Sequence, residues 1–354
     1  MQTSNHFAKS NLGQFPTFPS AMTRENFRAW VIATGRPDLW QFHDASSPPK
    51  DGPLEIVLDF GIPEHLRAAV GRATCPICSP MAPKYFDGAL AWFPNEGVLR
   101  AIGHECAKSH FGERVVVAAI AKGKHRDAVE AAQDYLIDTL PKVAGYRAEV
   151  EALRLVASDI DHLRRAMWQR LGKADCERAS RLGARGVLHI EAQRAVESVD
   201  RYGKQETVYE PLLVASYSVA GMNFLRRRFL LSALVTNTLE SLSKVHASDP
   251  EAALEFVAEN LRRDDDLFEA EALAKGATAA LLELRDAVAE AVAFTSPANL
   301  AKLSEWTYHE LSEAPFLLRY NNETPARFVG RRHGAAEHNF PIPASIASLW
   351  RTPQ

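Results

Sequence analysis

Three of the four cysteines in this 354-residue chain lie close together in the sequence. Cys75 and Cys78 form a C-x2-C pair, and Cys106 follows after a spacer of 27 residues. His110 stands four residues beyond Cys106. Three thiolates and one imidazole are the ligand set of a closed, tetrahedral zinc site. The spacing therefore predicts that Zn²⁺ is bound by Cys75, Cys78, Cys106 and His110.

The fourth ligand of this site has a rival. On a helix, Cys106 and His110 share one face, so both can reach a single ion. His104 would give the pattern C-x2-C-x25-H-x-C instead, but it would have to bend back around the start of the helix. We therefore favour His110. The alternative to a metal site is that the cysteines are buried, reduced core residues.

The predicted metal site is expected to be structural, because four protein ligands leave no position open for water or substrate. Known zinc-enzyme motifs are also missing. The one H-x-E, His189-Ile190-Glu191, follows the cysteine pair, whereas in zinc deaminases it comes first. An enzyme stays a second alternative, since His189, Glu191 and Tyr209 could assemble a site that no motif reveals.

The segment around the cysteines also suggests the elements that position them. Residues 88–94 are typical of one arm of a hairpin, Asn95-Glu96-Gly97 of its turn, and residues 103–107 of a second knuckle that leads into a helix. In this order of knuckle, hairpin and knuckle at a helix start, residues 72–112 resemble a treble-clef zinc finger. The resemblance covers a small part of the chain and implies a module; no family is recognised for the whole chain.

The rest of the chain favours helices. Eleven of the 20 prolines fall at or before Pro94 and only five more up to Pro315, so the long middle can hold helices. An almost heptad apolar stripe runs from Val150 to Leu171, with Arg164 as its one polar member. We expect a mainly α fold, a helical bundle with coiled-coil character, plus a small α+β zinc-stabilised module near the N-terminus.

Composition and spacing divide the chain into five expected regions. They are an irregular N-terminal arm with a short helix and a strand at 1–60, a zinc-finger-like module at 61–125, a helical region with a possible β insertion (185–220) at 126–245, an acidic helical region at 246–315, and a loop-rich C-terminal tail at 316–354.

The charge balance argues against a protein that is basic overall. The chain has 41 basic and 44 acidic residues, a net charge of −3. Residues 72–126 nevertheless carry eight bases against four acids, with aromatic residues between them. Such a surface can hold phosphates and stack bases. A nucleic-acid-binding regulator is therefore an alternative, with candidate contacts at Lys84, Arg100, Lys108, Arg114, Arg327, Arg331 and Arg332.

The pattern of apolar residues predicts no membrane association and no secretory signal. The longest unbroken apolar run is 115–121, far short of the roughly 20 residues that span a bilayer. Four cysteines, three of them clustered, are also unlike a secreted disulfide framework. The leading hypothesis is an intracellular, cytoplasmic zinc-binding adaptor or scaffold that acts through contacts with another protein or by self-association.

Overall fold

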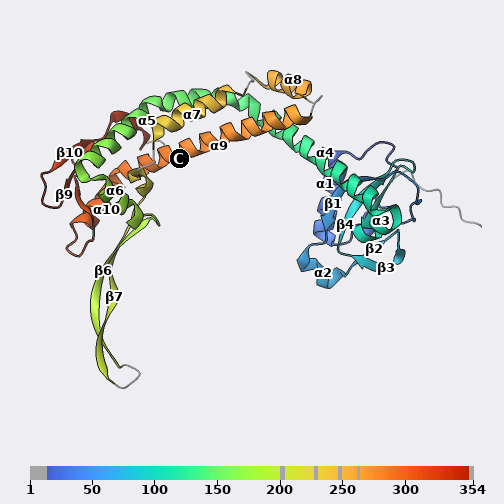
Figure 1. The fold of residues 1–354 in the computed structure, drawn as a ribbon, viewed down its shortest axis with the longest axis horizontal. Helices are drawn as coiled ribbons and strands as arrows, with labels where there is room; N and C mark the ends of the chain where they lie inside the picture. The colour runs from blue at the N-terminus through green and yellow to red at the C-terminus, as the bar shows by residue number, and fades with distance from the viewer. Residues whose placement is uncertain (1–13, 200–203, 227–229, 246–248, 261–263, 351–354) are drawn as a thin grey trace, which may run out of the picture. The chain divides into compact units, whose positions relative to one another are not determined.

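The structure of the protein is a computed structural model that describes residues 14–199, 204–226, 230–245, 249–260 and 264–350. The chain forms two compact units, Met1–Ala132 (the N-terminal unit) and Gln133–Gln354 (the C-terminal unit). Figure 1 shows that the described chain is mainly helical with several small sheets, which confirms that part of the predicted fold class. The boundary between the units falls within α4 (Glu113–Thr139).

A three-stranded antiparallel sheet forms the centre of the N-terminal unit, in the order β1 (Glu55–Gly61), β4 (Asp87–Phe93), β5 (Val98–Gly103). β4 and β5 form the hairpin that the sequence predicts. In its turn, Gly97 has a φ of 65°, which glycine adopts without steric cost, and donates to the Phe93 carbonyl oxygen at 2.8 Å.

The two faces of this sheet contact different cores, because successive side chains of a strand point to opposite faces. The α1-side core includes Leu90 and Trp92 of β4, and Phe27 of α1 (Ala21–Thr34). The cysteine-side core takes the alternate residues of β4 and residues of β1, β5 and α4, together with residues of three elements that surround the cysteines. These elements are β2 (Ala73–Cys75), β3 (Ser79–Tyr85) and α3 (His104–Phe111). The short elements η1 (Pro37–Leu39) and α2 (Glu64–Val70) complete the unit.

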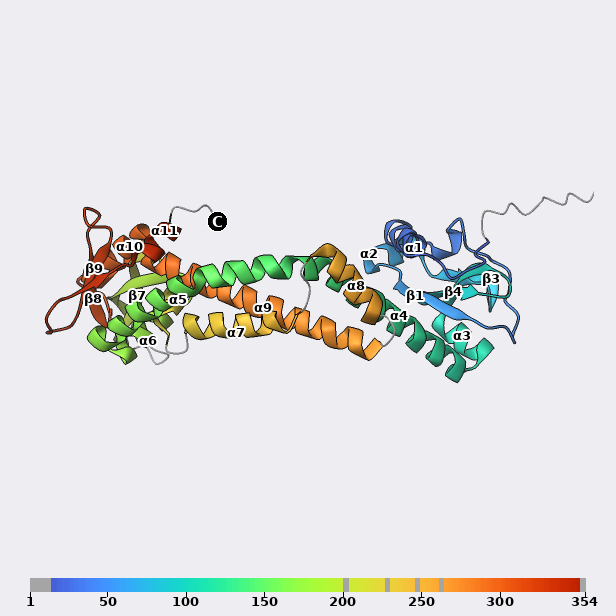
Figure 2. The same cartoon turned by 90° about the horizontal axis from the view of Figure 1, so that it is seen from above.

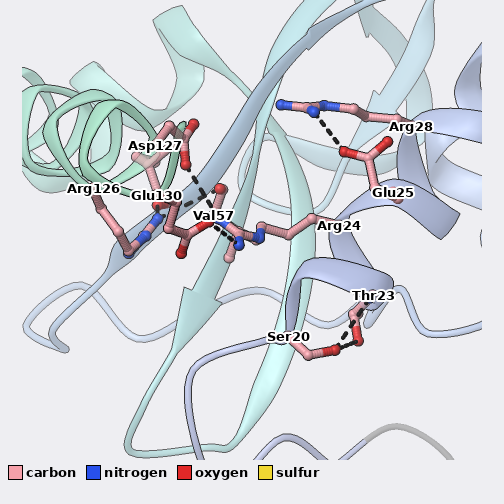
Figure 3. A network of polar contacts seen from close by, with 10 residues as sticks. Ser20, Thr23, Arg24, Glu25, Arg28, Val57, Arg126, Asp127 and Glu130 are labelled. Atoms are coloured by element: carbon pink, nitrogen blue, oxygen red, sulfur yellow. Dashed lines mark hydrogen bonds and ion pairs between the residues drawn. The ribbon is translucent and has the colours of Figure 1, made fainter. Parts of the chain in front are cut away.

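Polar contacts fix the first part of α4 against α1 and β1 (Figure 3). Arg24 of α1 is only 8% exposed; it donates to Asp127 at 3.2 Å and forms an ion pair with Glu130. Arg126, on the same helix as these acids, donates to the Ile56 carbonyl oxygen of β1 at 2.7 Å. The largely buried Arg24 guanidinium thus meets two carboxylates, the arrangement that compensates a cation for its lost hydration.

Three long helices pack side by side in the C-terminal unit (Figures 1 and 2): α5 (Val143–Leu171), α7 (Leu231–Ser243) and α9 (Asp264–Thr295). The predicted apolar stripe of α5 is largely buried between them. No helix in the described ranges combines the length and the apolar character needed to cross a bilayer. The shorter helices are η2 (Leu140–Lys142), α6 (Lys173–Leu182), η3 (Met222–Leu225), α8 (Pro250–Asn260), α10 (Pro297–Tyr308) and α11 (Ala344–Leu349).

The polar member of that stripe, Arg164, has a structural explanation. It is 1% exposed and donates to Asp161 at 2.9 Å. Asp161 also accepts from the backbone N–H groups of Leu231 (3.3 Å) and Ser232 (2.9 Å), the first residues of α7. The free N–H groups at a helix start need acceptors, and α7 has no capping side chain of its own, so α5 supplies one. Coiled-coil character remains a prediction.

A long two-stranded antiparallel ribbon, β6 (Val187–Val199) and β7 (Gln205–Ser218), lies within the predicted β insertion at 185–220. It extends away from the helices of its unit (Figure 1). At its neck, the Val219 N–H donates to the Gly186 carbonyl oxygen at 2.9 Å.

The tail at 316–354, expected to be loop-rich, differs from that prediction. Residues 316–341 form a three-stranded antiparallel sheet of β8 (Phe316–Tyr320), β9 (Arg327–Arg332) and β10 (His338–Pro341). Phe328 and Phe340 are buried and stack with ring centroids 5.1 Å apart. The strands have only five, six and four residues, so their apolar alternation is too short to stand out in the sequence.

Candidate metal centre

The three clustered cysteines come together in the N-terminal unit. The Sγ atoms of Cys75, Cys78 and Cys106 all lie within 4.8 Å of one another, so the group could hold a metal ion. Cys75 is buried, Cys106 half-buried and Cys78 exposed. In a tetrahedral zinc site with Zn–S bonds of about 2.3 Å, the sulfur atoms are about 3.8 Å apart. The separations in the structure, none above 4.8 Å, are compatible with that spacing.

Three different elements bring these thiols together. Cys75 ends β2, and a tight turn places Cys78 immediately before β3. Cys106 lies in the first turn of α3, where backbone N–H groups without helical partners favour a negatively charged side chain. The hairpin that contains the C-x2-C pair and the start of the helix therefore meet at one point, beside the cysteine-side core.

The electrostatics of the group favour a bound cation. Burial, followed by hydrogen bonding with Cys78 and the charge of Cys75, raises the pKa of Cys106. Thiols this close resist ionising together, because a second thiolate is repelled by the first. A divalent cation reverses this, since a coordinating thiol loses its proton. Thiolate donors are soft and suit Zn²⁺. The donor set therefore fits the predicted metal.

Neither predicted histidine belongs to the group of three. The Nε2 atom of His110 lies 3.2 Å from the carbonyl oxygen of Pro48, and its ring contacts Phe111. The Nε2 atom of His104 lies 3.2 Å from Oδ1 of Asp59. The structure thus shows three protein ligands together and gives both histidines other partners; the fourth ligand stays a prediction.

A buried tyrosine beside the cluster is one of the aromatic residues of 72–126, to which the sequence assigns no role at the metal site. Tyr85 is 7% exposed, and its hydroxyl has no hydrogen-bond partner among the described residues. Burial above all, then the charges of Cys75 and Asp38, raise the pKa of Tyr85. Its ring packs on the cross-strand pair Gly88 and Gly103, where a Cβ atom would lie only 2.8 and 3.0 Å from ring carbons. These two glycines are the feature of the sequence that could have indicated a large ring packed on this sheet.

Arg100, a predicted nucleic-acid contact, is a core residue, which corrects that prediction. It is fully buried and donates to both carboxylate oxygens of Glu96 at 2.8 Å and to the Ser46 carbonyl oxygen at 2.9 Å. Its guanidinium lies 4.6 Å from the centroid of the Phe93 ring. With its donors engaged inside the unit, Arg100 does not present its charge to a phosphate.

The other predicted basic contacts are divided between the two units. In the N-terminal unit, Lys84 and Arg114 are exposed, and Lys108 pairs with Glu105 at 2.8 Å. In the C-terminal unit, Arg327, Arg331 and Arg332 lie on strand β9, and Arg332 donates to Asp175 at 3.3 Å.

The residues of the enzyme alternative converge only in part. His189 and Glu191 line a cavity of about 240 Å³ together with Trp306. Tyr209 is not among the lining residues; it pairs with Ala195 farther along the ribbon and is 63% exposed.

Within that cavity, His189 makes a contact that needs no catalytic explanation. Its Nδ1 atom lies 3.1 Å from Oγ of Ser216, the residue directly opposite on β7. This is an ordinary cross-strand pair.

Comparisons with known proteins find no family model, no curated protein and no solved structure that matches this chain. A proposal about function therefore rests on the cysteine group and on the described surfaces.

Proposed function

We propose that this chain is a zinc-binding adaptor or scaffold of the cytoplasm, in which Zn²⁺ is structural and the function is contact with other protein chains. The observation that carries the proposal is the convergence of the Sγ atoms of Cys75, Cys78 and Cys106 beside a hydrophobic core. Zn²⁺ bound there would crosslink the β2–β3 hairpin to the start of α3. Such a crosslink contributes its binding free energy directly to folding.

The weakness of the hairpin supports a structural role for the metal. β2 has only three residues, and its pairing with β3 changes register on both sides of Thr74. A two-stranded sheet this short is marginal by itself. Zn²⁺ held by Cys75 and Cys78 at its turn would fix the hairpin in place, which leaves a folding role rather than a chemical one.

The order of elements supports the resemblance to a treble-clef finger. A turn with two cysteines is followed by the β4–β5 hairpin and then by α3, which carries Cys106 in its first turn. His110, four residues farther along α3, is the proposed fourth ligand, and binding would replace its contact with Pro48. The Tyr85 hydroxyl is proposed to donate to a thiolate of the loaded site, which would supply the partner that it lacks.

The adaptor role is supported by the surface of the C-terminal unit. The β6–β7 ribbon exposes large apolar side chains that include Tyr209 (63%), Leu213 (56%) and Val214 (46%). Contiguous exposed apolar surface marks sites of contact with other molecules. In addition, β7 contacts α10, which packs on α9 in the same unit.

Metal content tests the zinc part of the proposal. Elemental analysis of the purified chain is expected to find one Zn²⁺, which is lost in Cys106→Ser and His110→Ala and kept in His104→Ala. Cys176→Ser is the cysteine control, since Cys176 is fully buried, like Cys75, but belongs to the other unit. Wild-type protein without zinc after zinc-replete, reducing expression would refute the site.

Salt dependence separates the adaptor from the nucleic-acid-binding alternative. Binding through several phosphate contacts weakens steeply with salt. We expect no retention of the chain on DNA or RNA at moderate salt. Salt-dependent retention that is lost on replacing both Lys84 and Arg114 would favour the alternative, because these two bases are exposed on the N-terminal unit.

A further inference from the structure

The β6–β7 ribbon is uncovered over most of its length in the described chain. Its strands have 13 and 14 residues, and the two-stranded sheet leaves both outer edges without a partner strand. Leu188 and Ile190, near the neck, are each 1% exposed, whereas every residue of β7 from Gln205 to Val214 is exposed. An isolated two-stranded ribbon is marginally stable. A ribbon of this length therefore calls for a covering surface.

One face of the ribbon has a symmetric pattern. Arg194 and Glu210 are directly opposite each other and form an ion pair at 3.8 Å, so they share a face. Side chains two positions away share the same face. The pairs on either side of the ion pair are apolar: Val196 with Val208 on one side, and Ala192 with Leu212 on the other. We call these six residues the Arg194–Glu210 face.

The charge of the ribbon argues against an anionic partner. Residues 187–218 carry five acidic and three basic side chains. A nucleic acid or an anionic lipid surface would be repelled rather than bound.

The pattern of the Arg194–Glu210 face instead complements itself. A two-fold axis parallel to the ribbon lays β6 of one copy over β7 of a second copy. Residues that are cross-strand partners within one ribbon then face each other between the two copies, because such partners lie at the same height along the ribbon. Arg194 would meet Glu210 of the second copy, and the small Ala192 would meet the large Leu212. Opposite charges and complementary sizes thus coincide in one arrangement.

We propose that two copies of this chain associate by stacking their Arg194–Glu210 faces about this axis, which forms a four-stranded, two-layer sandwich. The proposal rests on the proposed adaptor function and names a second copy as the partner. Leu188 and Ile190 share this face but are already buried within their own chain, so its free part runs over residues 192–199 and extends about 27 Å, with a width of about 10 Å for two strands. The pair would bury roughly 500 Å² in total, below the ~1,000 Å² of a stable interface, so a weak dimer that dissociates at high micromolar concentration is expected.

The first test compares two adjacent leucines on opposite faces. Leu212 lies on the Arg194–Glu210 face, whereas Leu213 pairs with Glu191 and lies on the other. Sedimentation at about 10 μM to 1 mM, a range set by the weak affinity expected of a small interface, is expected to show a monomer–dimer equilibrium for the wild type. Leu212→Asp should weaken it about 30-fold or more, because it places a charge in the apolar contact. Leu213→Asp should leave it unchanged. A monomeric wild type, or equal effects of the two variants, would overturn the proposal.

A charge exchange tests the geometry without removing an apolar side chain. Arg194→Glu and Glu210→Arg should each be monomeric, because like charges then face each other between identical copies. An equimolar mixture of the two should form a heterodimer, because each copy now supplies the charge that the other lacks. A mixture that stays monomeric, while wild-type chains dimerise, would exclude the two-fold arrangement.

Zinc measured in the same samples keeps the two proposals separate. Dimers without zinc would refute the metal site and leave the ribbon interface standing; zinc-loaded monomers would do the reverse.

Discussion

The β4–β5 hairpin and the β6–β7 ribbon share an antiparallel backbone but differ in what covers them. β4 lies in the middle of a sheet, and all of its residues after Asp87 are buried. The outer edge of β5 is covered as well, since the Asp44 N–H donates to the Leu99 carbonyl oxygen at 2.8 Å. Beyond its neck, the described part of the β6–β7 ribbon has neither cover. The same secondary structure is thus buried within its own unit in one place and exposed in the other.

Metal removal should give the largest difference in stability between the unit that contains the β4–β5 hairpin and the unit that contains the β6–β7 ribbon. Chelation, or Cys106→Ser, is expected to lower the free energy of unfolding of the N-terminal unit by roughly 5 kcal/mol or more, because binding energy and folding energy are linked. Scanning calorimetry with and without chelator measures the effect. The C-terminal unit is the internal control, and its transition should not move. A chelator-insensitive N-terminal unit would contradict a structural metal.

A leucine in each hairpin gives the next largest difference. Leu90 of β4 is fully buried, and Leu212 of β7 is 45% exposed. Leu90→Ala should cost about 3–4 kcal/mol, since it leaves a cavity in the α1-side core. Leu212→Ala should change the free energy of unfolding of the dilute monomer by less than about 0.5 kcal/mol. Urea titration at low protein concentration measures both, and equal losses would mean that the ribbon is covered within its own chain.

Acidification should lower the free energy of unfolding of the N-terminal unit, because it protonates His43 in the segment that covers the edge of β5. Burial lowers the pKa of His43 from 6.5 to about 4, and Arg100 adds to this, while Asp38 and Asp44 oppose it. Its neutral Nδ1 accepts from the Ala101 N–H at 3.1 Å. Between these two pKa values the unfolded chain binds a proton that the folded chain does not. Stability should therefore fall as the pH drops from 6.5 to 4, by about 2–3 kcal/mol in total.

His43→Asn is the control for this pH effect. The Asn Oδ1 atom can accept from Ala101 in place of Nδ1 but does not titrate. Urea midpoints measured between pH 7 and 4 should fall less steeply in the variant. Identical slopes would assign the acid sensitivity to other groups.

Tyr85→Phe should give the smallest effect, with opposite signs in the two metal states. Without metal, removal of a buried hydroxyl that lacks a partner should raise the free energy of unfolding by about 1 kcal/mol. With metal, loss of a donor to a thiolate should weaken zinc binding about 10-fold. Chelator competition measures the second effect, and unchanged competition would show that the phenol does not serve the site.

Sequence spacing located the cysteines because a knuckle and a helix start are local structures. The same spacing could not place the histidines. The partner of His110 is the backbone of Pro48, and that of His104 is Asp59, each far away in the sequence. Which acceptor a ring reaches depends on how distant segments pack. That information is absent from a spacing of four residues on one helix.

Buried cations show the same limit. The sequence predicts Arg100 as a phosphate contact and marks Arg164 as the polar member of an apolar stripe, yet both are at most 1% exposed. Each buried charge is compensated by an acid three or four residues away in the sequence, Glu96 or Asp161. These local pairs are visible in the sequence. Whether such a pair lies inside or outside depends on the surfaces that close over it, which only the fold supplies.

The hydrogen bond from the Val219 N–H to the Gly186 carbonyl oxygen closes the base of the ribbon and makes it a self-contained insertion. The chain enters and leaves at one point, and Asp161 of α5 caps α7 without using any residue of the ribbon. Residues 192–212, beyond the buried Leu188 and Ile190 at the neck, can therefore be shortened by opposed pairs, or exchanged for a short turn, while the helices on either side keep their contacts. The length of the ribbon can therefore change while the helices of the unit stay as they are.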